Sequence, residues 1–230
     1  MIKIENIQVF NIEGAIRGMR NPLNSWDRSD SMMCKGDFFQ DCKSTCKECP
    51  RKDDKFEDDV FCVGSADLEL MHKLYVAGPP HRKYLRQIFV CMDITAPTYL
   101  WSEIDTYKVG VTRNSCSFMH KGLSKEFSIE DFSRHYKDDY TTKLWKHVID
   151  ELNRLRGLYN VTTDPNIFQE IRDLLPSGYN LRATVTCSYE NIVNMIEWRS
   201  NHRLTEWREF CNTMVNELPY LKEIINGTES

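Results

Sequence analysis

The sequence predicts an α+β protein, because short stretches typical of β-strands are separated by longer stretches with helical periodicity. The strand patterns cover residues 2–10, 88–94 and 181–187. The clearest helical patterns, in which apolar residues recur every three or four positions, cover residues 65–77, 141–158 and 205–218. Strands and helices mixed in this order predict a sheet with flanking helices.

Composition places the chain among ordinary globular proteins. It has 230 residues, of which 41% are hydrophobic and 28% charged, enough for one good-sized domain over residues 1–230. The net charge of −4 argues against a broad nucleic-acid-binding face, so we expect no direct nucleic-acid binding. No apolar run approaches a membrane span, and the first residues lack a signal-peptide core. We therefore expect a cytoplasmic protein that does not enter membranes.

The first element is the strand over residues 2–10, where the side chains alternate well enough for a β-strand. A short helix over residues 12–19 follows and leads to Arg20-Asn21-Pro22. Residues 31–63 then look like a loop inserted into the fold. They are rich in lysine, aspartate and cysteine and have neither helical nor strand periodicity.

Five of the nine cysteines lie in this insertion, at Cys34, Cys42, Cys46, Cys49 and Cys62. The spacing Cys42-x3-Cys46-x2-Cys49 brings three thiols within reach of one ion, with Cys34 or Cys62 as a fourth ligand. Four thiolates suit a structural zinc ion, and a metal would order a polar loop without its own core. The spacing also resembles the iron–sulfur motif of radical S-adenosylmethionine enzymes, and free thiols are a third interpretation.

The helix over residues 65–77 ends at Gly78-Pro79-Pro80, because glycine and proline interrupt helical hydrogen bonding. A basic stretch from His81 to Gln87 leads into the strand at 88–94, and a further helix is expected over residues 98–109. Polar side chains gather on that helix and just after it, including Glu103, Lys108, Arg113 and Asn114. They predict either a binding pocket or a polar loop on a subunit surface.

Two helices follow in the second half of the chain. The first, over residues 141–158, carries Leu144, Val148, Leu152 and Leu155 on one face. The second begins at Asp164-Pro165, the pattern of an N-cap followed by proline at the first helical position. It stops at Leu175-Pro176, because proline disfavours helix in the residue before it. Arg172 lies at the edge of its apolar face.

The strand at 181–187 leads to Ser188, which can cap the N-terminus of another helix. Apolar residues then recur at helical spacing, and Arg199 falls near the middle of their stripe. Burying an arginine is unfavourable unless an anion meets it. Either Arg199 binds an anionic ligand, or it pairs with a carboxylate at the helix end and reaches solvent.

Two of these segments carry a resemblance to a known family. Arg172-Asp-Leu-Leu-Pro176 and the segment from Asn194 to Arg199 resemble flavin-dependent thymidylate synthases, in a divergent form like those in phage genomes. The resemblance implies an antiparallel or mixed sheet with flanking helices, here with the cysteine-rich loop at about 31–63 inserted. It also implies that Arg172 holds the phosphate of deoxyuridine monophosphate (dUMP) and that Arg199 meets the pyrimidine ring as the catalytic residue.

Other site residues follow from matching the chain to the family's motifs. On the flavin side the resemblance implies His81, Lys108 and Asn194, and on the substrate side Arg113 and Asn114. To these we add Ser188 on the flavin side, at the start of its helix, and Glu103 on the substrate side, from the polar group described above. The family's diagnostic Arg-His-Arg falls on Thr106-Tyr107-Lys108, so one cation of that motif remains. This departure opens the question of whether FAD is bound.

The family reaction methylates the pyrimidine ring of dUMP, with carbon from methylene-tetrahydrofolate and hydride from reduced FAD, which NADPH regenerates. The family is a homotetramer with shared sites, and a phage-encoded member would act in the host cytoplasm. A related one-carbon transfer to C5 of the ring, such as that of a hydroxymethyl group, is also open. Two alternatives remain: a nucleotide-binding protein of the same fold that has lost FAD, and a zinc-stabilised interaction protein.

Overall fold

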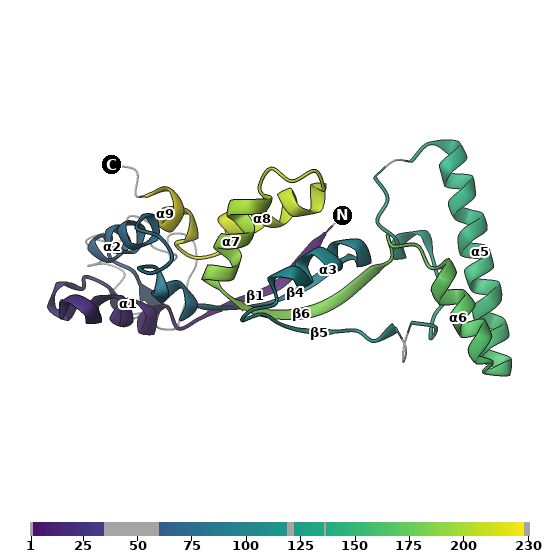
Figure 1. Ribbon diagram of the computed structural model, residues 1–230, viewed down its shortest axis with the longest axis horizontal. Coiled ribbons are helices and arrows are strands. Elements are labelled where there is room, and N and C mark those ends of the chain that lie inside the picture. Colours follow the sequence, from purple (N-terminus) through teal and green to yellow (C-terminus); the bar gives the residue numbers. More distant parts are fainter. Residues whose placement is uncertain (1, 35–59, 119–121, 136, 228–230) are drawn as a thin grey trace. The chain divides into compact units, whose positions relative to one another are not determined.

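The computed structural model describes residues 2–34, 60–118, 122–135 and 137–227 (Figure 1). The chain divides into two compact units, and each is described by itself. The first unit combines Met1–Ile7, Cys91–Thr186 and Trp198–Phe210. The second unit combines Gln8–Val90, Cys187–Glu197 and Cys211–Ser230. That residues 1–230 act as a single domain stays a prediction.

Strands and helices are mixed along the chain. The strands are β1 (Lys3–Phe10), β2 (Met32–Cys34), β3 (Val60–Cys62), β4 (Phe89–Pro97), β5 (Thr112–Ser115) and β6 (Asn180–Ser188). The helices are α1 (Ile12–Arg20), α2 (Ser65–Val76), α3 (Thr98–Ile104), α5 (Asp139–Thr162), α6 (Pro165–Leu174), α7 (Tyr189–Arg199), α8 (Thr205–Glu217) and α9 (Leu221–Asn226). Within the described ranges, no helix is long and apolar enough to cross a membrane.

The main sheet has four strands in the order β1-β4-β6-β5, which confirms the α+β class. Strand β5 pairs antiparallel with β6, and Arg113 lies opposite Val185. Side chains alternate between the two faces of a strand. Along β6, Ala183, Val185 and Cys187 are accordingly buried, and Thr184 and Thr186 between them are exposed. Helix α3 packs against β6, where Nε1 of Trp101 donates a hydrogen bond to the Leu181 carbonyl at 2.9 Å.

Around β5 the structure adds a strand that was not predicted and corrects one prediction. The sequence gives no sign of this strand, because all four of its residues are polar and exposed and so lack an apolar alternation. The helix expected over residues 98–109 ends at Ile104 and continues as a 3₁₀ turn over Asp105–Tyr107. Gly110 then adopts a φ of 74°, which glycine reaches without steric cost, and the chain turns there into β5.

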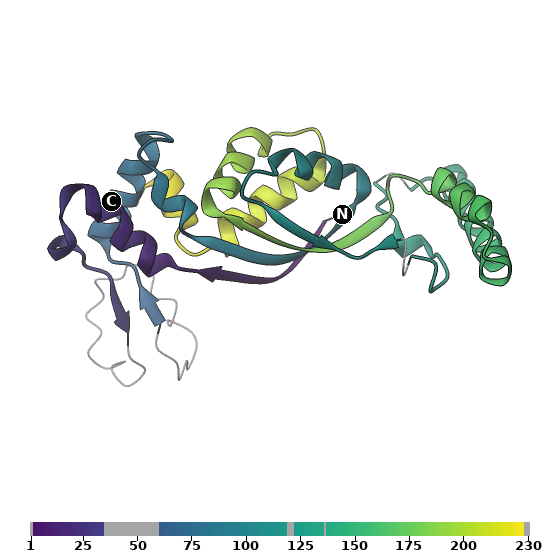
Figure 2. The ribbon, with the colours of Figure 1, turned by 60° about the horizontal axis from the view of Figure 1, so that its bottom comes forward.

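Helices α5 and α6 lie side by side in the first unit (Figure 2). Asp138 caps α5 by accepting hydrogen bonds from the backbone N–H groups of Tyr140 and Thr141 at 2.9 and 3.0 Å. Asp164 caps α6 in the same way, and Pro165 takes the first helical position, as predicted. Helix α5 is longer at both ends than its apolar pattern indicates.

The core shared by α5 and α6 is rich in aromatic side chains. Its buried members are Phe118, Leu123, Phe127, Phe132, Ile149, Leu152, Leu155 and Ile171. Leu152 and Leu155 confirm the predicted apolar face of α5, but Leu144 is 54% exposed and the prediction for it is wrong. Trp145 takes the core-facing position in that turn instead, and its ring centroid lies 5.1 Å from that of Phe132.

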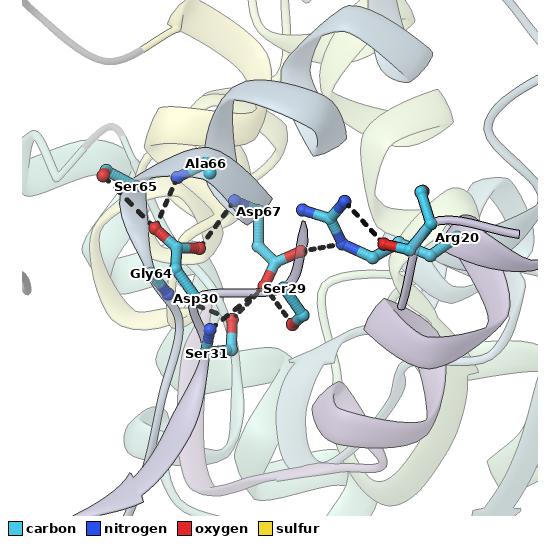
Figure 3. Close-up of polar contacts among 9 residues, drawn as sticks. Arg20, Ser29, Asp30, Ser31, Gly64, Ser65, Ala66 and Asp67 are labelled. Atoms are coloured by element: carbon cyan, nitrogen blue, oxygen red, sulfur yellow. Dashed lines mark hydrogen bonds and ion pairs between the residues drawn. The ribbon is translucent and has the colours of Figure 1, made fainter. Parts of the chain in front are cut away.

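A buried ion pair joins Arg20 to Asp67 in the second unit (Figure 3). Nε of Arg20 lies 2.6 Å from Oδ1 of Asp67, and the two side chains are 5% and 0% exposed. The hydroxyls of Ser29 and Ser31 each donate to Oδ2 of Asp67 at 2.6 Å. Asp30 accepts hydrogen bonds from the backbone N–H groups that begin α2. These contacts fix the chain on both sides of the inserted loop.

The two ends of the predicted insertion form a ribbon. Strand β2 pairs antiparallel with β3, so that Met32 lies opposite Cys62 and Cys34 lies opposite Val60. The expectation that residues 31–63 lack strand structure is therefore wrong at these ends, where three-residue strands are too short for periodicity to be visible. Residues 35–59 lie outside the described residues.

Candidate functional site

The carboxylate of Glu103 on α3 is contacted by side chains of the Trp198–Phe210 segment of the first unit. Nε1 of Trp207 donates a hydrogen bond to Oε2 of Glu103 at 2.8 Å. Nη1 of Arg199 lies 3.4 Å from the same oxygen, and Nε2 of His202 lies 3.7 Å from it. The Glu103 carboxylate is 33% exposed, so this cluster reaches the surface.

Arg199, the residue on which the predicted site depends, ends α7 and is 24% exposed. Its Nε donates a hydrogen bond to the Tyr107 hydroxyl at 3.0 Å. Its guanidinium carbon lies over the rings of Tyr107 and Trp207, at 5.7 and 5.3 Å from their centroids. Pairing with a carboxylate was one of the two interpretations from sequence, and Glu103 is that carboxylate. Since a guanidinium has five N–H donors, these contacts leave donors for a ligand.

A second polar cluster lies beside the first, between α3 and α8. The carboxyl group of Glu206 is buried and accepts a hydrogen bond from the Tyr99 hydroxyl. Nε2 of His135 lies 2.8 Å from the same oxygen. Burial by itself raises the pKa of Glu206, but the hydrogen bonds from Tyr99 and His135 outweigh it and lower the pKa. The pKa of Tyr99 is raised by burial and by the Glu206 carboxylate.

The remaining predicted residues of α3 and β5 lie at the surface of the first unit. Arg113 pairs with Asp105 at 3.2 Å and lies over the Trp101 ring, 4.9 Å from its centroid. Asn114 is exposed on the edge strand β5. Lys108 is exposed as well, and no carboxylate in the described part of the chain pairs with it. Arg113 is therefore already neutralised by a neighbour, whereas Lys108 is not.

Arg172 lies in the last turn of α6 and is exposed, as the predicted phosphate contact requires. Its guanidinium carbon lies over the Phe118 ring at 4.9 Å from the centroid. Among the residues that the structure describes, no carboxylate pairs with it. Arg172 belongs to the α5–α6 cluster and Arg199 to the Glu103 cluster, and no direct contact between the described residues joins the two arginines.

In the second unit Arg82, which the sequence did not single out, is buried among polar groups. Its Nη1 lies 2.8 Å from Glu197, and its Nη2 donates to Oδ1 of Asn194 at 2.9 Å. Burial by itself lowers the pKa of Arg82, but Glu197 and Glu190 raise it overall. The guanidinium lies over the Tyr75 ring. Arg82 thus orients the Asn194 amide and leaves its nitrogen as a donor.

His81 and Ser188, two of the residues predicted on the flavin side, differ in how exposed their side chains are. His81 follows the Gly78-Pro79-Pro80 turn and is exposed. Ser188 is 7% exposed, and its hydroxyl is used at the start of α7, where it accepts the backbone N–H of Asn191 and donates to the Asn191 side chain. This contact confirms Ser188 as a helix cap, and its role toward a cofactor stays a prediction.

The predicted metal ligands fall partly outside the described residues, since Cys42, Cys46 and Cys49 lie in 35–59. Cys34 is partly buried and Cys62 is 1% exposed. The ribbon register places both on the same face, two positions apart. In the described ranges, no three His, Cys, Asp or Glu side chains are grouped to hold a metal ion. The zinc site stays a prediction.

Sequence reasoning missed several members of these clusters, chiefly Arg82, Tyr99, His135 and Glu206. One signal was present, because Tyr99 and Glu103 are four residues apart and so share one face of a helix. A polar face on a short helix indicates partners elsewhere in the chain. Which segments supply those partners depends on tertiary contacts that no local pattern encodes.

Comparison with known proteins defines the fold class. No family model matches the sequence, and no curated protein matches it. Solved structures do match. One is thymidylate synthase X from Helicobacter pylori with FAD and dUMP, at a TM-score of 0.64 and 13% identity, covering 97% of this chain and 96% of that chain. Another is the flavin-dependent thymidylate synthase from Helicobacter pylori complexed with FAD and dUMP. It has a TM-score of 0.66 and 13% identity, covering 96% of this chain and 100% of that chain.

The chain therefore has an α+β fold similar to that of flavin-dependent thymidylate synthases over nearly its whole length. At 13% identity the likeness concerns the fold. Activity and ligands depend on the residues of the site, because one fold can carry many functions.

Proposed function

We propose that this protein is a pyrimidine nucleotide enzyme of the flavin-dependent thymidylate synthase type, acting on dUMP or a close relative. The observation that carries the proposal is the partly exposed Arg199 guanidinium, fixed by Tyr107 and Glu103. A planar guanidinium offers paired donors that match the carbonyl edge of a pyrimidine. Similar solved structures that contain dUMP support this choice of ligand.

The roles of the other residues follow from their exposure and charge. Arg172 is exposed and not matched by a described carboxylate, which suits a phosphate group. Asn114 adds an exposed amide on the substrate side. Arg113 is engaged by Asp105 and would have to exchange that partner to meet an anion. Glu103 keeps Arg199 in place, so its role in the proposal is positioning.

The chain also offers donors that suit a flavin. FAD carries a diphosphate and a ring edge rich in acceptors, and the Lys108 ammonium, the His81 imidazole and the Asn194 amide nitrogen are donors. Ser188 would support this set through the start of α7. When bound, FAD would supply the hydride, NADPH would regenerate its reduced form, and methylene-tetrahydrofolate would supply the carbon. The protein residues bind and orient, and they exclude water from the ring.

The proposal is tested by absorbance spectroscopy of the purified protein, followed by titration with FAD with and without dUMP. We expect micromolar FAD binding that strengthens with dUMP. Arg199→Lys should weaken dUMP binding by about tenfold or more, because lysine loses the bidentate fork and the stacking on Tyr107. Arg154→Lys is the matched control, since Arg154 is exposed on α5 and pairs with Glu151. Absence of binding at millimolar FAD would refute the proposal that this protein is a flavoenzyme.

One observation favours a second candidate, a nucleotide-binding protein that has lost FAD. Tyr107 stands where the family has a histidine, and its hydroxyl is engaged by Arg199 rather than left for a flavin. A colourless protein that binds dUMP but not FAD would support this candidate. A third candidate, a zinc-stabilised interaction protein, predicts stoichiometric zinc in metal analysis without nucleotide affinity.

We also propose a homotetrameric assembly in a cytoplasmic setting, the host cytoplasm if the gene is phage-borne. The family's shared sites are the reason, because the substrate arginines of one chain would face residues 81–120 of another. Light scattering on a size-exclusion column measures the assembly. A monomer at micromolar concentration would contradict a shared site.

A further inference from the structure

Three segments of the first unit meet at one carboxylate oxygen. Tyr99 comes from α3, Glu206 from α8, and His135 from the loop before α5. The Tyr99 hydroxyl donates to Oε1 of Glu206, and Nε2 of His135 lies 2.8 Å from the same oxygen. The Glu206 side chain is 0% exposed, but the His135 ring is 53% exposed. A buried carboxylate thus holds an imidazole that faces solvent.

This contact fixes which nitrogen of His135 is basic. The pKa of Glu206 is lowered, so the carboxylate is ionised at neutral pH and can only accept hydrogen bonds. Nε2 of His135 must then carry a proton, and Nδ1 is left as the acceptor of the neutral ring. No described residue hydrogen-bonds to Nδ1. A carboxylate that sets the tautomer of a half-exposed histidine is the arrangement of a general base.

The cluster also continues directly into the Arg199 cluster. Tyr99 and Glu103 are one turn apart on the same face of α3, a separation of about 5–6 Å between Cβ atoms. Their partners, Glu206 and Trp207, are neighbours on α8. A ligand held by Arg199 beside Glu103 therefore lies roughly one helical turn from the groups that orient His135.

A structural tether explains these contacts less well than a chemical role. A neutral amide at position 206 could hold Tyr99 and His135 without burying a charge, which is unfavourable because the ion loses its hydration. A carboxylate becomes useful when the imidazole acquires a proton, because its negative charge then stabilises the positive charge on the ring. The charge on Glu206 suits a histidine that changes its protonation state.

We propose that His135 is the proton acceptor for a pyrimidine nucleotide bound by Arg199; this rests on the function proposed above. When a one-carbon group replaces hydrogen at C5, that hydrogen has to leave as a proton. The C5–H bond breaks, its electron pair stays in the ring, and the proton passes to Nδ1 of His135. Glu206 then stabilises the imidazolium through Nε2–H. The groups that face His135 are Tyr99 and Glu206, and Glu209 on α8 adds negative charge beside Tyr99.

The first test uses the full-length protein and does not need turnover. Nitrogen-15 NMR of labelled histidine reports the tautomer of each ring, and His135→Gln identifies the signal. We expect the Nε2–H tautomer for His135, and a mixed population in Glu206→Gln, because the amide can accept from or donate to the ring. A dominant Nδ1–H tautomer in the unmodified protein, or a tautomer unaffected by Glu206→Gln, would overturn the proposal.

The second test uses the protein loaded with FAD, with dUMP deuterated at C5. His135→Gln should lower kcat by about 10²–10⁴-fold, leave the dissociation constant of dUMP within about twofold, and reveal a primary isotope effect. His147→Gln, an exposed histidine on α5, is the matched control and should change none of these. An unchanged kcat in His135→Gln would overturn the role, as would a loss without an isotope effect. If the unmodified protein binds neither FAD nor dUMP, the proposed function fails and the role of His135 toward a nucleotide fails with it, whereas a wrong tautomer with nucleotide binding intact overturns the role of His135 alone.

Discussion

Replacing Asp67 by asparagine should strongly destabilise the second unit. Asp67 is fully buried and receives Arg20 and the hydroxyls of Ser29 and Ser31. Asparagine keeps nearly the same shape but removes the charge. Its amide group also places a donor where the carboxylate accepted one. Arg20, whose side chain is 5% exposed, is then left as a buried charge without a counter-ion.

The expected loss follows from burial rather than from the number of contacts. Removing one partner of a buried ion pair costs about 3–5 kcal/mol, because the remaining charge stays desolvated. An exposed pair contributes about 0.3–0.5 kcal/mol. The chain contains such a pair in the same unit, Lys73 and Glu69, whose side chains are 66% and 61% exposed. Lys73→Gln is therefore the matched control for Asp67→Asn.

The assay is urea denaturation followed by circular dichroism, with far-UV spectra of the native state as a check on folding. We expect Asp67→Asn to lower the free energy of unfolding by about 3–5 kcal/mol and Lys73→Gln by less than about 0.5 kcal/mol. If Asp67→Asn is too unstable to purify, Asp67→Asn combined with Arg20→Met should recover part of the loss. Equal losses in Asp67→Asn and the control would refute the reasoning from burial.

The same carboxylate predicts how stability depends on pH. Burial by itself raises the pKa of Asp67, but hydrogen bonds from Ser29, Ser31 and Arg20 and the Arg20 charge lower it overall. A carboxyl whose pKa is lower in the folded state stabilises the protein above its unfolded pKa of about 3.9. That contribution is lost as the pH falls through the folded pKa. Acid unfolding of Asp67→Asn should therefore lack this component.

Three further predictions concern the rest of the fold. Leu152→Ala in the α5–α6 core should lower the free energy of unfolding by about 2–5 kcal/mol. Leu144→Ala, at an exposed position, should change it by less than about 0.5 kcal/mol. Equal effects of the two variants would contradict the assigned core. The hydrogen bond from Thr184 is the main reason that the pKa of Asp93 is lowered to about 2. Asp93 therefore stabilises the folded state above its unfolded pKa of about 3.9, and this contribution should be lost as the pH falls toward 2. In an NMR titration Thr184→Val should raise the pKa of Asp93 in the folded state, and an unchanged value would exclude the hydrogen bond as its cause. Asp138→Ala should cost about 1 kcal/mol by removing the cap of α5, and a thermal melt identical to that of the parent protein would count against the cap.

Local sequence patterns located most of the fold. The capped start of α6 at Asp164-Pro165 and the strand that becomes β6 are encoded by residues next to each other, so they are visible in the sequence. The short polar strand β5 and the ribbon of β2 and β3 were not visible in the sequence, because a strand of three or four residues is stabilised by pairing with its partner rather than by local preference. Tertiary pairing overrides weak local preference in such segments.

Local patterns were enough to predict the α+β class, the main helices and strands, and the position of Arg199 at the end of a helix that carries an apolar stripe. They also left open whether that arginine meets a carboxylate or a ligand. The folded chain shows that Glu103, Tyr107 and Trp207 surround Arg199. It also shows that Glu206 holds His135. Helical and strand periodicity reflect only residues a few positions apart. The contacts around Arg199 join residues that are distant in the sequence, and Glu103 and Trp207 lie about a hundred positions apart. No local pattern can therefore predict them.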